Sequence, residues 1–403
     1  MKEPKIRIKG FSGEWKRPLL EECLEISNEV NNQNLYGKNE VLSVSDESGV
    51  VNQIKHLGRS YAGKSLSGYK ILRPDQIVYT KSPLRQKPFG IIKVNNGETG
   101  IVSVLYGIYD AKEGVYPKYI QRYFDPSNRI NNYLLPLVNK GAKNTMNISD
   151  ETALQGTISI PPTQDEQKAI CNVLDGIDAQ ILASTSRLAS LKQMKAASLQ
   201  AMFPQEGETV PKVRFKEFKG EWDKQSASDL FLSIDERNRP ELPVLSACQD
   251  IRGMIPREKI GFNVSHDTSN EVTYKRVKPG QFVIHLRSFQ GGFAHSSYDG
   301  IISPAYTVFD FKDKERHDDY YWKIVFMSRA FIDRLRLITY GIRDGRSINF
   351  DEFKNLLFLF PSKEEQHAIA TFFRSLDRQI ALHTQRLEKL KQIKAACLDK
   401  MFV

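Results

Sequence analysis

The sequence has no long apolar segment and few cysteines. None of its apolar runs approaches the roughly 18 residues that a membrane-spanning helix needs, and its first residues lack the apolar region of a signal peptide. We therefore expect a cytoplasmic protein with no membrane partner. The four cysteines, Cys23, Cys171, Cys248 and Cys397, are far apart and lack the spacing of zinc ligands. They are expected to be reduced and structural, and no metal site is predicted.

The sequence also has no Gly-rich dinucleotide loop and no nucleophile elbow. Residues 58–65, GRSYAGKS, do match the Walker A pattern of nucleotide-binding loops. A phosphate loop must open a helix, whereas Gly68 and Pro74 follow this one closely and the second half of the chain has no counterpart. Nucleotide hydrolysis is therefore not predicted.

A second pattern resembles a magnesium-dependent nuclease site. Asp75, Asp110 and Lys112 have the residue types that bind the metal and polarise the attacking water. The corresponding positions in the second half keep Asp310 and a lysine, but Gly280 replaces the first aspartate. We predict that these acids are structural, at the ends of strands and in turns, and that the chain has no catalytic residues and no cofactor of its own.

Basic residues outnumber acidic ones, 58 Lys and Arg against 48 Asp and Glu, a formal net charge of +10 in 403 residues. This length predicts two or more domains, and the charge favours a polyanionic partner. Residues 51–100 are strongly basic and could face phosphates. Their nine cations are Lys55, Arg59, Lys64, Lys70, Arg73, Lys81, Arg85, Lys87 and Lys93, against two acids, Asp75 and Glu98.

The chain contains an internal duplication. Residues 4–15, PKIRIKGFSGEW, reappear as residues 211–222, PKVRFKEFKGEW, and residues 100–110 resemble residues 300–310. The last part of each half, residues 166–203 and 365–402, matches most closely, whereas the segments between these anchors differ. Such a pattern indicates one mechanical role performed twice, on two different targets.

Each half ends in a predicted long helix. Both helices follow a proline, with Thr163 or Ser362 as the N-cap and acids in the first turn. Each has an apolar stripe with heptad-compatible spacing, which predicts that the two helices pair as a coiled coil. The helix-pairing residues are Leu174, Ile177, Ile181, Leu188 and Leu191 in the first copy and Phe373, Leu376, Ile380, Leu387 and Leu390 in the second.

Polar residues interrupt both stripes at corresponding positions. Ser184 and Lys195 in the first helix correspond to His383 and Lys394 in the second, and polar residues in such a seam can fix its register. A helix of about 39 residues rises about 58 Å, more than one turn of B-DNA at about 34 Å. The pair is thus long enough to act as a ruler along DNA.

The segments between the anchors, roughly residues 16–160 and 223–360, have the short apolar runs and turn residues of strands with some helix. Their loops contain Arg, Lys and Gln, the side chains that read guanine, phosphate and adenine. We predict that these loops bind DNA. The candidate residues are Lys81, Arg85, Lys87 and Lys143 in the first half and Arg287, Gln290, Arg343 and Arg346 in the second.

Three features together resemble the specificity subunits of type I restriction-modification enzymes. They are the linker and repeat FPQEGETVPKVRFKEFKGEW at residues 203–222, the paired PxxxEQxxI starts of the helices at residues 162–170 and 361–369, and the GIxSxxY blocks at residues 100–106 and 300–306. The resemblance covers the whole chain.

This resemblance implies an α+β fold: two mixed α/β target recognition domains joined by two long antiparallel helices that form a coiled coil, in a pseudo-twofold duplication. The expected domains are residues 1–160 and 205–360, and the expected helical spacers are residues 161–204 and 361–403. Each domain would read one half of a bipartite, asymmetric target in double-stranded DNA, with the helices setting the gap.

The resemblance also implies partner subunits. Two methyltransferase subunits would supply S-adenosylmethionine and adenine methylation, and two restriction subunits would supply ATP- and magnesium-dependent translocation and cleavage. Two alternatives stay open at this point: an autonomous magnesium-dependent nuclease, and a recognition chain of a related type II system. A helical scaffold without affinity for DNA is a third.

Overall fold

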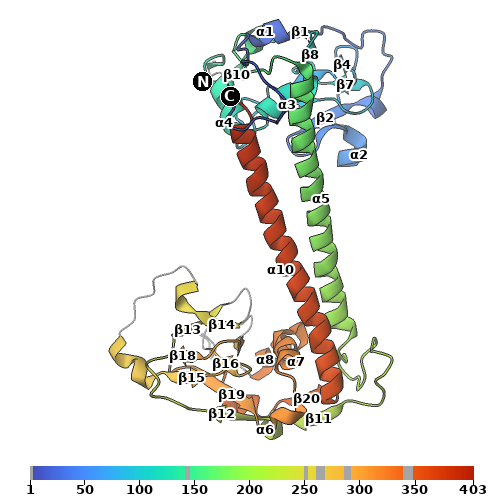
Figure 1. The fold of residues 1–403 in the computed structure, drawn as a ribbon. Coiled ribbons are helices and arrows are strands. Elements are labelled where there is room, and N and C mark those ends of the chain that lie inside the picture. The colour runs from blue at the N-terminus through green and yellow to red at the C-terminus, as the bar shows by residue number, and fades with distance from the viewer. Residues whose placement is uncertain (1–2, 141–145, 249–252, 260–267, 286–291, 339–347) are drawn as a thin grey trace. The chain divides into compact units, whose positions relative to one another are not determined.

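The computed structural model describes residues 3–140, 146–248, 253–259, 268–285, 292–338 and 348–403, which fall into two units (Figure 1). Unit 1 comprises Met1–Thr185 and Gln385–Val403, and unit 2 comprises Ser186–Thr384. Because both boundaries lie within the two long helices, each unit contains one domain together with a part of each helix.

Unit 1 is built around a four-stranded antiparallel sheet of order β1–β8–β5–β6 among the residues described. The strands are β1 (Leu24–Ile26), β8 (Gly107–Ala111), β5 (Ile77–Tyr79) and β6 (Ile92–Val94). Two-stranded ladders join β2 (Leu42–Ser45) to β3 (Gly49–Asn52), β4 (Lys70–Leu72) to β7 (Gly100–Val102), and β9 (Asn139–Lys140) to β10 (Met146–Asn147). The short helices are α1 (Leu20–Cys23), α2 (Gln53–Leu57), α3 (Pro117–Phe124) and α4 (Ser127–Leu134), with 3-10 turns η1 (Lys38–Glu40) and η3 (Thr152–Leu154).

Unit 2 repeats this arrangement with a wider sheet of order β12–β19–β16–β17–β14–β13. The strands are β12 (Phe231–Ile234), β19 (Thr307–Phe311), β16 (Phe282–Ile284), β17 (Phe293–Ser296), β14 (Gly253–Pro256) and β13 (Leu245–Cys248). Ladders join β15 (Lys275–Val277) to β18 (Gly300–Ile302), and β11 (Asp223–Ser226) to β20 (Leu357–Phe360). The short helices are α6 (Ala227–Leu230), α7 (Asp319–Met327), α8 (Arg329–Ile338) and α9 (Phe350–Phe353), with 3-10 turns η4 (Arg257–Lys259), η5 (Thr268–Thr273) and η6 (Lys314–Arg316).

The order β1–β8–β5–β6 of unit 1 therefore recurs as β12–β19–β16–β17 in unit 2. The units differ at one edge, because β14 pairs in parallel with β17 and so adds the β13–β14 hairpin to the main sheet, whereas β2 and β3 form a separate ladder. The strands predicted within residues 76–79, 89–94 and 281–284 are confirmed as β5, β6 and β16. The mixed α/β character of both domains is confirmed as well.

The two long helices are α5 (Gln164–Ala201) and α10 (Lys363–Lys400). Their predicted N-caps are confirmed, since the hydroxyl of Thr163 accepts a hydrogen bond from the backbone of Glu166, at 3.3 Å, and Ser362 does the same for Glu365, at 3.5 Å. No helix in the described part of the chain is long and apolar enough to cross a membrane.

Each long helix ends in the unit built around the other half of the chain. In unit 1 the backbone N–H of Ile6 donates to the carbonyl of Lys400, at 2.9 Å, and in unit 2 Val213 donates to Ala201, also at 2.9 Å. The aromatic ring that follows each helix then enters the core. The ring centroids of Phe402 and Tyr119 lie 5.4 Å apart in unit 1, and those of Phe203 and Tyr321 lie 5.7 Å apart in unit 2.

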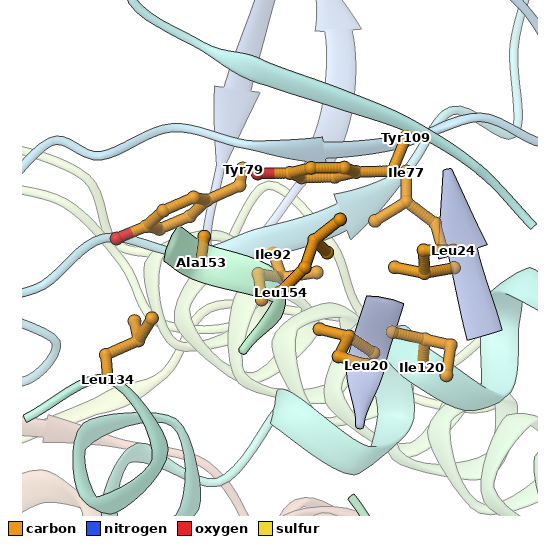
Figure 2. Close-up of a pocket in the computed structure, with 10 residues that line it drawn as sticks. All are labelled: Leu20, Leu24, Ile77, Tyr79, Ile92, Tyr109, Ile120, Leu134, Ala153 and Leu154. Atoms are coloured by element: carbon orange, nitrogen blue, oxygen red, sulfur yellow. The ribbon is translucent and has the colours of Figure 1, made fainter. Parts of the chain in front are cut away.

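The core of unit 1 encloses a small apolar cavity (Figure 2). It is lined by Leu20, Leu24, Ile77, Tyr79, Ile92, Tyr109, Ile120, Leu134, Ala153 and Leu154. The cavity has room for about one water molecule and offers no polar lining surface, so it is a packing defect of the core rather than a ligand site.

Candidate nucleic-acid interface

Three of the eight predicted DNA-binding residues lie in the described part of the chain: Lys81, Arg85 and Lys87, in the loop between β5 and β6. The other five lie outside the described residues. They are Lys143, Arg287, Gln290, Arg343 and Arg346.

Lys81 has a left-handed backbone conformation, with φ of 54°, and its ammonium lies 2.6 Å from the carboxylate of Asp150. Lys70 binds the same carboxylate at 2.8 Å. Burial alone would raise the pKa of Asp150, but the hydrogen bonds from the two lysines outweigh it and hold that pKa below its ordinary value. The charge of Lys81 is thus already compensated inside unit 1.

Lys87 is also paired within unit 1. Its side chain is buried, and its ammonium lies 2.6 Å from Asp46, which Lys93 also contacts at 3.2 Å. A phosphate contact by Lys87 would require this partly buried pair to open, which costs more than moving an exposed lysine. Arg85, by contrast, is exposed and has no ion pair with any residue that the structure describes, so its charge is available.

The structure describes both motifs that resemble catalytic sites. The Walker A pattern begins at Gly58, the left-handed C-cap of α2, and therefore follows a short helix instead of opening one. Asp75 and its counterpart Gly280 both have positive φ, 63° and 84°. Glycine and aspartate tolerate this backbone conformation, which explains why one replaces the other at this turn. Asp110 accepts a hydrogen bond from Gln76, at 2.9 Å.

Asp310 in unit 2 accepts the corresponding bond from Gln281, also at 2.9 Å. The carboxylates at the ends of β8 and β19 thus hold the neighbouring turns in both units. Within the described ranges, no group of three or more His, Cys, Asp or Glu side chains is arranged to hold a metal ion.

The predicted helix-pairing residues are all at least partly buried. Leu174, Ile177, Leu191, Phe373, Leu376, Leu387 and Leu390 are buried, and Ile181, Leu188 and Ile380 are half-buried. Leu174 belongs to the core of unit 1, and Leu191, Phe373 and Leu376 belong to the core of unit 2. The stripes therefore also anchor the helices to the domains, a role that the heptad spacing does not distinguish from helix pairing.

Two ion pairs join the helices, one in each unit. Lys394 of α10 lies 2.6 Å from Asp178 of α5 in unit 1, and Lys195 of α5 lies 2.5 Å from Asp377 of α10 in unit 2. Lys394 and Lys195 are 199 residues apart, and so are Asp377 and Asp178. The two ion pairs are therefore the same contact, with α5 and α10 in exchanged roles. The lysines are those that interrupt the two apolar stripes.

In unit 1 the domain also holds α5 through charge. Arg122 of α3 binds Asp175 at 2.6 Å and Asp178 at 2.8 Å, and Lys118 binds Asp175 at 2.6 Å. Burial would raise the pKa of Asp175, but the hydrogen bonds from Arg122 and Lys118 lower it below the ordinary value. The helix is thus fixed to the domain by charged as well as apolar contacts.

A second pair of equivalent contacts was missed at the level of sequence. Arg7 binds the buried Glu166 through two nitrogens, at 2.8 and 2.9 Å, and Arg214 binds the buried Glu365 at 2.7 and 2.6 Å. Each pair ties the repeat at the start of one half to the start of that half's long helix. The sequence does contain a signal for these pairs, because an arginine and a glutamate occur at corresponding positions of both copies of the duplication.

Comparison with known proteins agrees with these features. Residues 220–392 match the family of type I restriction modification DNA specificity domains. No curated protein sequence matches the chain significantly.

Among solved structures, the S subunit of a type I restriction-modification system from M. genitalium is similar with a TM-score of 0.56 and 11% identity, over 100% of this chain and 99% of that one. The HsdS subunit from Thermoanaerobacter tengcongensis has a TM-score of 0.47 and 15% identity, over 96% of each chain. A chain from a type I R-M system has a TM-score of 0.46 and 14% identity, over 96% of this chain and 97% of that one.

The resemblance predicted from the sequence is confirmed for residues 220–392, which match the family of type I restriction modification DNA specificity domains, and the chain has the fold of the M. genitalium S subunit.

Proposed function

We propose that this chain is the DNA sequence-recognition subunit of a type I restriction-modification complex. The match of residues 220–392 to a DNA specificity domain carries the proposal. The repeated strand order supports it further, because unit 1 provides a second domain on the same framework. Each domain reads one half of a bipartite, asymmetric target, and α5 and α10 set the gap between the halves.

The reactions take place in partner subunits. Two methyltransferase subunits bind S-adenosylmethionine and methylate adenine, and two restriction subunits use ATP and magnesium to translocate and cleave DNA, all in the cytoplasm. Structural roles for Asp75 and Asp110, the acids of the candidate nuclease site, support this division of labour. A recognition chain of a type II system would have the same fold and differ only in its partners.

The test is to sequence the methylome of cells that express this chain with its cognate methyltransferase subunit. Cells that express the methyltransferase alone are the control. We expect a new split adenine motif that appears only with both proteins. If the two proteins associate and no motif appears, the proposal is wrong, and magnesium-dependent cleavage by the purified chain, lost on Asp110→Ala, would then favour the nuclease.

A further inference from the structure

The structure separates the nine cations of residues 51–100 into two groups. Five are paired with carboxylates in unit 1: Lys70 and Lys81 with Asp150, Arg73 with Glu29, and Lys87 and Lys93 with Asp46. The other four, Lys55, Arg59, Lys64 and Arg85, are exposed and have no ion pair with any residue in the described ranges. Three of these four lie within residues 55–64, on α2 and the segment that follows it.

Hydrogen bonds to the side chains of Asn52 and Gln53 hold this segment in place. Asn52 caps α2, and the carboxamide oxygen of Gln53 accepts hydrogen bonds from the hydroxyl of Ser60, at 3.1 Å, and from the backbone of Tyr61, at 2.6 Å. Gly58 ends the helix in a left-handed conformation that turns the chain back over Gln53. The backbone of residues 53–61 is thus preformed, and it is the first part of a loop that runs to residue 69.

A small apolar cluster supports the far end of the loop. Ala62, Leu66 and Tyr69 pack against a buried group formed by Val41, Ile71 and Ile101. With these side chains turned inward, Lys64 and Ser65 between Ala62 and Leu66 remain exposed. Figure 1 shows α2 at the periphery of unit 1.

The exposed surface of the loop has the composition of a nucleic-acid reader. Residues 51–72 contain no acidic residue. The guanidinium of Arg59 lies over the ring of Tyr61, 4.6 Å from its centroid, although that ring is 61% exposed. Glu40 lies in the turn η1, which contacts α2. Its carboxylate accepts a hydrogen bond from the backbone N–H of Gly37, at 2.8 Å.

We propose that this loop is the base-reading element of the first domain. Arg59, oriented by Tyr61, donates two hydrogen bonds to O6 and N7 of a guanine in the major groove, and Lys55 and Lys64 bind the flanking phosphates. A planar guanidinium can form this bidentate contact, whereas a lysine can only supply a point charge. The inference rests on the proposed function and specifies one base of one half-site.

The second unit places different residues at the same position. The backbone N–H of Gln53 donates to Val41, at 2.9 Å, and that of Arg257 donates to Val244, at 3.0 Å, each at the end of the corresponding strand. Val41 and Val244 form the same parallel bridge, to Ile101 and Ile301. One framework thus presents two unrelated sequences, as expected where two domains read different targets.

The test uses the full chain with its cognate methyltransferase subunit. Methylome sequencing of Arg59→Ala and Arg59→Lys is compared with wild type, and binding is measured on duplexes with each single base-pair change in the motif. We expect both variants to lose, by on the order of 10-fold or more, the preference for one G·C pair in one half-site. The other half-site should keep its preferences, which also shows that the variants fold and assemble.

Lys64→Ala should instead weaken binding to all duplexes alike and reduce the salt dependence of log K by about 1, without changing the motif. Arg17→Ala, which removes an exposed arginine elsewhere in unit 1, is the matched control for charge and should leave the motif unchanged. An unchanged motif in Arg59→Ala would overturn the inference and leave the proposed function intact. The absence of any motif with the wild-type chain would overturn both.

Discussion

Two glycines show how the duplicated framework constrains single residues. A Cβ atom on Gly100 would meet the carbonyl oxygen of Glu40, and one on Gly300 would meet that of Pro243, both at distances shorter than real Cβ contacts. Each glycine begins the second strand of an equivalent ladder, β4–β7 or β15–β18. Close approach of another backbone segment therefore requires glycine at the same place in both units.

We predict that Gly100→Ala and Gly300→Ala each lower the free energy of unfolding by about 1–3 kcal/mol, because a backbone oxygen cannot move aside as a side chain can. Urea unfolding of the full chain measures the effect. Gly176→Ala is the control, since Gly176 lies within α5 with nothing near its Cβ position and should gain up to about 1 kcal/mol. Equal midpoints for all three variants would contradict the prediction.

Among the elements, the long helices depend on contacts at both ends. Their starts are capped and tied by Arg7 and Arg214, and their ends enter the core of the unit built around the other half. Between the ends, the repeated pairs Lys394–Asp178 and Lys195–Asp377 compensate the two lysines that interrupt the apolar stripes. A lysine in such a seam is unfavourable in any register that leaves it without a carboxylate.

We predict a double-mutant cycle on Lys195 and Asp377 to give a coupling energy of about 0.5–1 kcal/mol, the range for partly exposed pairs. Lys195→Met and Asp377→Asn, singly and together, would be compared in urea unfolding at low and high salt. The coupling should shrink at high salt. The exposed pair Lys391–Glu388, within α10, is the comparison and should show weaker coupling. Coupling within error of zero at low salt would refute the role of the Lys195 pair.

For the whole molecule, the duplication separates a shared framework from variable loops. The anchor segments recur with the same hydrogen bonds and strand order, whereas the loops on them differ. Under the proposed function, such a design would let one domain change its target without disturbing the other. The length of the two long helices can likewise change without a change in either domain.

We predict that replacing residues 223–360 with those of another family member changes one half-site only. Inserting seven residues after both Ser184 and His383 should keep the seam in phase and lengthen each helix by about 10 Å, which corresponds to about three base pairs of gap. Methylome sequencing measures both outcomes. A domain replacement that alters both half-sites, or an insertion that leaves the gap unchanged, would count against the assignment.

Much of the framework follows from local sequence. The duplication, the long helices, their caps Thr163 and Ser362, and strands such as β5 and β16 were predicted because caps, periodicity and short apolar runs are properties of neighbouring residues. The resemblance to a specificity domain was predicted for the same reason, since its motifs are contiguous.

The tertiary structure decided which charges are free and where the helices are anchored. The sequence predicted Lys81 and Lys87 as DNA contacts, and this stays a prediction. Both are paired with carboxylates, of Asp150 and Asp46, that the sequence does not mark as partners, whereas Arg59 is exposed and has no ion pair among the described residues. Ion pairing depends on distance in space, which local sequence does not encode. Composition therefore determined that the chain favours an anionic partner, and folding determined which side chains are available to bind it.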